Sequence, residues 1–140
     1  MQTVFEYLYR DADNFKAFGQ IILDGEFVSN NEKLIRSKLE SEEFFIAEQI
    51  GVPALYDQLY QWSGGGPIEA DHCWHEFIGF RNAEPAEKGT ECAVTMADFV
   101  ARFTSVDRWD GALSPHFNMS GGSFREHRSD YPRNQGSIHF

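Results

Sequence analysis

Alternating apolar and polar positions at the start of the chain predict a β-hairpin. Over residues 3–10, aromatic and β-branched residues recur at every second position, which is the period of a strand. Residues 11–14 supply turn chemistry, because Asp and Asn side chains bond nearby backbone groups and tolerate left-handed conformations. Residues 15–23 then form a second apolar run. We therefore predict antiparallel strands at residues 3–10 and 15–23.

A third strand is predicted at residues 72–80, within the stretch Asp-His-Cys-Trp-His-Glu-Phe-Ile-Gly-Phe at residues 71–80. Its aromatic and branched residues follow Gly-Gly-Gly-Pro, a combination that favours a strand over a helix. A period of two separates the residues into two faces, His72, Trp74, Glu76 and Ile78 against Cys73, His75 and Phe77. The two histidines then point apart, whereas a helix would place them on one face.

Helical periodicity and capping residues predict three helices, starting near Asn30, Pro53 and Met96. Ser29 and Glu32 match a capping box. Thr95, three residues before Asp98, is predicted to cap the third helix. The glycines at 64–66 precede a proline and follow a predicted helix. That order indicates a helix C-cap, since a phosphate-binding loop has its glycines before the helix.

These elements predict one α+β domain, an antiparallel sheet of three to four strands with about three helices packed on one face. A chain of 140 residues can bury a core of this kind without further support. We expect the domain to span residues 1–117, closed by Trp109, Leu113 and Phe117. Residues 118–140 are a polar C-terminal tail that could dock through apolar side chains, namely Phe124, Tyr131, Ile138 and Phe140.

The charge of the chain restricts its partners. Acidic residues outnumber basic ones by 22 to 12, which gives a net charge of −10. An acidic protein repels nucleic acid phosphates and anionic lipids, so we expect no direct nucleic acid binding and no membrane binding. A charged partner should be a protein with a basic surface. The alternative is that the acids only keep a Phe-rich protein soluble.

Cysteine use and the N-terminus indicate a cytoplasmic protein. Cys73 and Cys92 could form at most one disulfide, and residues 1–10 lack the basic start and apolar run of a signal peptide. No apolar run approaches the 18 or more residues that a transmembrane helix needs. The oligomeric state stays open.

Residues 71–76 also carry the candidate catalytic chemistry. If the protein is an enzyme, we expect His75, Glu76 and His72 to act as its acid and base groups. A metal could use His72 or His75 with Asp71, Cys73, Cys92, His116, His127 or His139. The chain has neither a Cys-x-x-Cys nor a His-x-x-x-His pair, so we predict no metal and no cofactor.

The predicted hairpin turn is a candidate ligand or partner site. It combines hydrogen-bond donors and acceptors around one turn, with a tryptophan from the third strand: Tyr9, Arg10, Asp11, Asn14, Lys16 and Trp74. The alternative is a solvated turn in which Arg10 pairs locally with Asp11 or Asp13.

Two segments carry a resemblance. The stretch Tyr-Leu-Tyr-Arg-Asp-Ala-Asp-Asn-Phe-Lys at 7–16, with Asp-His-Cys-Trp-His-Glu-Phe at 71–77, resembles a group of small uncharacterised bacterial proteins. They share a Tyr-x-Tyr-Arg-Asp-Ala start and an Asp-His-x-Trp-His-Glu stretch, and the resemblance implies no activity or cofactor.

We therefore expect a small acidic interaction or accessory module that binds a protein partner. One version is a bacterial or phage-encoded inhibitor that occupies a basic groove. The alternative is a small hydrolase or lyase that uses a His/Glu or metal site around the central strand.

Overall fold

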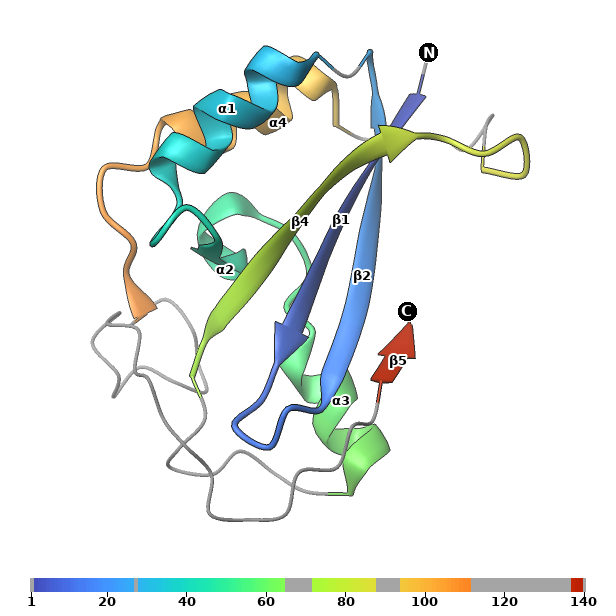
Figure 1. Cartoon of the computed structure of the whole chain (residues 1–140), viewed down its shortest axis with the longest axis vertical. Helices are drawn as coiled ribbons and strands as arrows, with labels where there is room; N and C mark the ends of the chain where they lie inside the picture. The colour runs from blue at the N-terminus through green and yellow to red at the C-terminus, as the bar shows by residue number, and fades with distance from the viewer. Residues whose placement is uncertain (1, 27, 65–71, 88–93, 112–136, 140) are drawn as a thin grey trace.

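The computed structural model describes residues 2–26, 28–64, 72–87, 94–111 and 137–139, and its fold is α+β (Figure 1). The elements in chain order are β1 (Gln2–Arg10), β2 (Lys16–Asp24), α1 (Ser29–Lys38), β3 (Phe44–Ile46), α2 (Ala47–Ile50), α3 (Tyr56–Ser63), β4 (Trp74–Asn82), α4 (Met96–Thr104) and β5 (Ser137–His139). The sheet order is β3-β4-β1-β2-β5. The first four of these strands pair antiparallel, and β5 joins the edge of β2 in parallel.

The three predicted strands are confirmed, with their ends shifted by one or two residues. β1 is central, because β2 pairs with one of its edges and β4 with the other. The pairing of β1 with β4 contains a bulge: Glu6 pairs with Gly79, but Tyr7 pairs with Phe77, so Ile78 is the extra residue. Gly79 has a φ of 154°, which an L side chain rarely adopts.

The core lies on the side of the sheet that the odd-numbered residues of β1 face. Phe5, Tyr7 and Tyr9 have at most 1% exposure, and every helix contributes at least one side chain to the same cluster, among them Ile35, Ile50, Tyr56 and Phe99. α1 and α4 pack against each other beside the sheet (Figure 1). The predicted placement of helices on one face agrees with this core.

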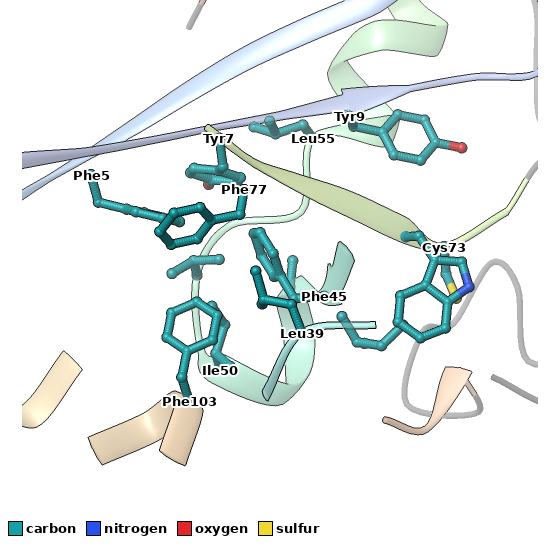
Figure 2. Packing of buried hydrophobic residues seen from close by; sticks show 14 of the residues in the cluster. Phe5, Tyr7, Tyr9, Leu39, Phe45, Ile50, Leu55, Cys73, Phe77 and Phe103 are labelled. Atoms are coloured by element: carbon teal, nitrogen blue, oxygen red, sulfur yellow. The ribbon is translucent and has the colours of Figure 1, made fainter. Parts of the chain in front are cut away.

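Phenylalanine rings fill the centre of the core. The ring of Phe5 lies 4.8 Å from that of Phe99 and 5.4 Å from that of Phe77, both in tilted arrangements. Figure 2 shows Phe5 and Phe77 beside each other, with Phe45 and Phe103 between the sheet and the helices. Burying each such ring stabilises the fold by about 1.5–3 kcal/mol, so this cluster is a major source of stability.

α1 begins at Ser29, close to the predicted start near Asn30, but its predicted cap and the predicted start of α3 differ from the structure. Val28 is the N-cap of α1 and no side chain caps the helix, so the predicted capping role of Ser29 is wrong. α3 starts at Tyr56 and not near Pro53, because side chains of the sheet bind the backbone before it. The Pro53 carbonyl accepts a hydrogen bond from Tyr7, and the Leu55 N–H donates one to His75.

The other two capping predictions are confirmed. The Thr95 side chain accepts a hydrogen bond from the Asp98 N–H at the start of α4. Gly64 ends α3 in the left-handed conformation with a φ of 78°. Trp109 packs against the core as predicted, whereas Leu113, Phe117, Phe124 and Tyr131 lie outside the described residues. The backbone of the tail is described at residues 137–139, where it pairs with β2.

Within the described residues, no helix has the length and apolar character that crossing a membrane requires.

Candidate functional site

Tyrosine and histidine rings gather where the end of β1 meets the start of β4. Tyr9 pairs with His75 in the sheet, and their ring centroids are 5.2 Å apart. His72 lies against the same tyrosine at 5.6 Å. Tyr56 and Tyr60, four residues apart on α3, approach it at 5.5 and 6.3 Å. We call these five residues the Tyr–His cluster.

Hydrogen bonds fix Tyr9 within this cluster. Its hydroxyl donates to the His72 carbonyl at 2.7 Å and lies 2.9 Å from the Tyr60 hydroxyl. A hydroxyl has one hydrogen to donate, so Tyr60 is the donor in the second bond. The network therefore ties β1 to α3 and to the residues before β4.

His75 is held in one neutral form by backbone groups. Its Nε2 accepts a hydrogen bond from the Leu55 N–H at 3.0 Å, so its proton is on Nδ1, which lies 3.3 Å from the Cys73 carbonyl. Burial lowers the pKa of His75 to about 3, a hydrogen bond to the Cys73 backbone opposes that shift, and a protonated His72 would lower the pKa further. His75 is 0% exposed and uncharged near pH 7.

His72 is also uncharged near pH 7. Burial lowers its pKa to about 4, with a smaller lowering from the Arg10 charge and an opposing hydrogen bond to the Arg10 backbone. Its Nδ1 accepts a hydrogen bond from the Trp74 N–H at 3.0 Å. The prediction that the two histidines point apart is wrong, because His72 precedes β4 and both rings lie against Tyr9.

The structure does not bring the candidate acid/base residues His75 and Glu76 together. His75 points into the core, whereas Glu76 pairs with Leu8 in the sheet and its carboxylate binds Arg10. The Arg10 Nε lies 2.9 Å from one Glu76 oxygen, and its Nη2 lies 3.4 Å from the other. This is a two-point contact between guanidinium and carboxylate across neighbouring strands.

The hairpin turn is organised by its own side chains. Asp11 is buried, and its Oδ1 accepts hydrogen bonds from the N–H groups of Asp13 and Phe15 at 3.0 and 2.9 Å. Arg10 also donates to Asn14 Oδ1 at 2.6 Å, and Asn14 has a φ of 69°. The structure shows an ion pair of Arg10 with Glu76.

The remaining candidate binding residues differ in burial, and Lys16 pairs with Arg10 in the sheet. Lys16 is partly exposed at the start of β2. Trp74 is 0% exposed and belongs to the core cluster, although it was predicted to share a face with Glu76. The sequence indicated a strand at Trp74 but gave no sign that its side chain is covered.

The candidate metal ligands do not form a site within the described part of the chain. Among those residues, no group of three His, Cys, Asp or Glu side chains could hold a metal ion. Asp71, Cys92, His116 and His127 lie outside the described residues, and His139 is described only by its backbone in β5.

The pairing of arginines with acids on the surface is a feature that the sequence did not predict. Several arginines are engaged within the molecule: Arg10 with Glu76, Arg36 with Glu32, Arg81 with Glu6 and Glu87, and Arg102 with the carbonyls of Ile50 and Gly51. The hydrogen bond from Arg81 is the main reason that the pKa of Glu87 is lowered to about 2. The positive charge of these arginines is thus largely compensated.

The charge that remains exposed is mostly negative. Ten acidic side chains are exposed in the described part of the chain: Asp24, Glu26, Glu40, Glu42, Glu43, Asp57, Glu84, Asp98, Asp107 and Asp110. The exposed bases there are Lys33, Lys38 and Arg108. Net charge predicted an acidic excess, but the pairing of the arginines depends on the fold.

Comparison with family models, curated proteins and solved structures finds no match to this chain.

Proposed function

We propose that this chain is a small acidic interaction or accessory module that binds a protein partner through a basic surface of that partner. The observation that carries the proposal is the exposed charge, ten acids against three bases in the described part. Because Arg10, Arg36 and Arg81 pair with acids, and the charge left exposed in the described part of the chain is mostly negative, that part of the surface has a negative electric field. Such a field attracts a basic protein and accelerates the encounter between the two.

The same field opposes nucleic acid and anionic membranes as partners. A protein that itself binds nucleic acid has a basic groove, and an acidic module is suited to occupy it. We infer that an inhibitor of this kind, encoded by a bacterium or a phage and acting in the cytoplasm, is the concrete form of this function. Its small size and lack of a catalytic motif are consistent with that role.

The enzyme alternative has weaker support from the geometry. A general acid or base must come within hydrogen-bond distance of its substrate. His75 is 0% exposed with both ring nitrogens directed at backbone groups, and Glu76 is engaged by Arg10.

The proposal is tested by capturing partners from the native host with the full chain and then varying its charge. One variant removes four exposed carboxylates: Asp24→Asn, Glu26→Gln, Glu42→Gln and Glu43→Gln. Its matched control, Lys33→Gln with Lys38→Gln, makes the chain more acidic. We expect the first variant to bind the captured partner at least about tenfold more weakly and the control to bind it equally or more tightly. Recovery of no basic protein, or equal binding by both variants, would refute the proposal.

A further inference from the structure

Among the residues that the structure describes, one edge of β2 is paired at its two ends and has no strand partner between them. The Asp24 N–H donates to the Val94 carbonyl, so the backbone groups of even-numbered residues in β2 point away from β1. At the other end, residues 16–18 pair with β5. Gln20 and Ile22 therefore direct N–H and C=O groups outward, and no strand within the described residues pairs with them.

The pairing with β5 shows that this edge accepts a further strand. β5 runs parallel to β2 and ends beside Phe18 in the register (Figure 1). The open part, residues 19–23, is about 17 Å long at roughly 3.3 Å per residue, which matches the common length of a strand. An open edge of this kind is a template on which another chain can add a strand.

The side chains along this edge define what it would bind. On one face, Gln20 is exposed and Ile22 is partly buried, and on the other face Ile21 is partly buried. Gln20 donates to Glu87 at 3.3 Å and accepts from Arg81 at 3.4 Å. A strand alongside would thus meet a polar position next to two apolar ones.

The surroundings of the edge are acidic. Glu6 and Glu87 share one arginine, Arg81, which leaves an excess of negative charge beside Gln20. Three exposed acids flank the same end of β2: Asp24 and Glu26 follow the strand, and Glu84 lies in the turn that Glu87 closes. We call these five acids the β2 rim. A second copy of this chain would bring another acidic rim to the same edge, so like charges oppose self-pairing.

We propose that residues 19–23 of β2 receive an extended segment of the basic partner by strand addition, with a basic residue opposite Gln20 and apolar residues opposite Ile21 and Ile22. Main-chain hydrogen bonds to Gln20 and Ile22 hold the segment, and the β2 rim selects its charge. This inference rests on the proposed function and identifies where the partner docks.

The test uses the full chain and the capped peptide Thr-Val-Ile-Arg-Thr, with amide exchange followed residue by residue by NMR. In the free protein, the amides of Gln20 and Ile22 should exchange rapidly while those of Ile21 and Leu23 are slow. The peptide should slow exchange at Gln20 and Ile22 at least about tenfold, and the peptide with Glu in place of Arg should bind more weakly. Slow exchange at both outward amides without peptide, or no change at saturating peptide, would overturn the proposal.

Two variants separate edge docking from the proposed function. Gln20→Pro removes an outward N–H and leaves the ladder to β1 intact, and Ile22→Lys adds repulsion without changing the backbone. Glu42→Lys with Glu43→Lys is the control, because these acids precede β3 at the opposite edge of the sheet. We expect both β2 variants to lose the peptide and the captured partner, and the control to retain the peptide.

The outcomes are distinguishable. If the captured partner still binds both β2 variants fully while responding to charge, the edge proposal is wrong and the proposed function stands. If the peptide binds the edge but no basic partner is captured, the docking site stands and the proposed function fails. A third outcome would also contradict the proposal. If sedimentation shows that the free protein is a dimer, and the amides of Gln20 and Ile22 exchange slowly in that dimer, the edge is occupied by a second copy of this chain.

Discussion

At the residue scale, the histidines of the Tyr–His cluster stabilise the fold in their neutral forms. His75 joins β4 to the segment before α3 through the Leu55 N–H, and His72 accepts the Trp74 N–H at the start of β4. Sequence reading identified both histidines as the chemically notable residues. It could not show that the Leu55 N–H engages His75, because that contact joins segments 20 residues apart in the sequence.

Protonation of these histidines should destabilise the protein in mild acid. The pKa values of His75 and His72 fall to about 3 and about 4 in the fold, below the 6.5 of a free histidine, so the unfolded state binds more protons between these limits. Stability is therefore complete above about pH 6.5 and falls as the pH decreases, by up to about 1.4 kcal/mol per pH unit for each histidine.

Urea unfolding between about pH 7 and about pH 5 measures this effect, since carboxylates contribute little in that window. His72→Gln should reduce the slope of stability against pH. A stability that does not change over this range would contradict the burial of two neutral histidines.

The Tyr9 hydroxyl should contribute measurably to stability. Tyr9→Phe removes its bonds to the His72 carbonyl and to Tyr60, and leaves buried polar groups without their partner. We expect a loss of about 1–3 kcal/mol in the free energy of unfolding, measured by urea titration. A loss smaller than about 0.5 kcal/mol would show that water or another group replaces the hydroxyl.

At the element scale, strong local patterns predicted the long strands and α4, whereas tertiary contacts determined the rest. Alternation along β1 and the cap at Thr95 are encoded by adjacent residues. β3 has three residues and α2 has four, which is too short for a periodic signal. The start of α3 is delayed by Tyr7 and His75, which belong to other elements.

The two capping predictions can be compared directly by mutation. Thr95→Ala removes the acceptor for the Asp98 N–H and should lower the free energy of unfolding by about 0.5–2 kcal/mol. Ser29→Ala is the matched control, because Ser29 makes no capping bond in α1, and it should change stability by less than about 0.5 kcal/mol. Equal losses in the two variants, measured by urea unfolding, would contradict the assigned caps.

At the scale of the whole molecule, the fold determines which charged side chains pair with each other and which stay exposed. The sequence shows a net charge of −10, and in the described part of the chain the fold pairs Arg10, Arg36 and Arg81 with acids while ten other acids stay exposed. The class of partner could therefore be proposed from composition. The docking edge could not, because it depends on which strand pairs with which and where β5 ends.

The central claim is that the acidic surface binds a basic protein partner, and the dependence of that affinity on salt tests it most directly. The dissociation constant of the captured partner is measured by titration calorimetry from about 50 mM to about 300 mM salt, over which the screening length falls from more than about 10 Å to less than about 8 Å. We expect the affinity to fall at least about tenfold over this range, since exposed charges drive the association. An affinity that stays constant as salt increases would contradict the claim.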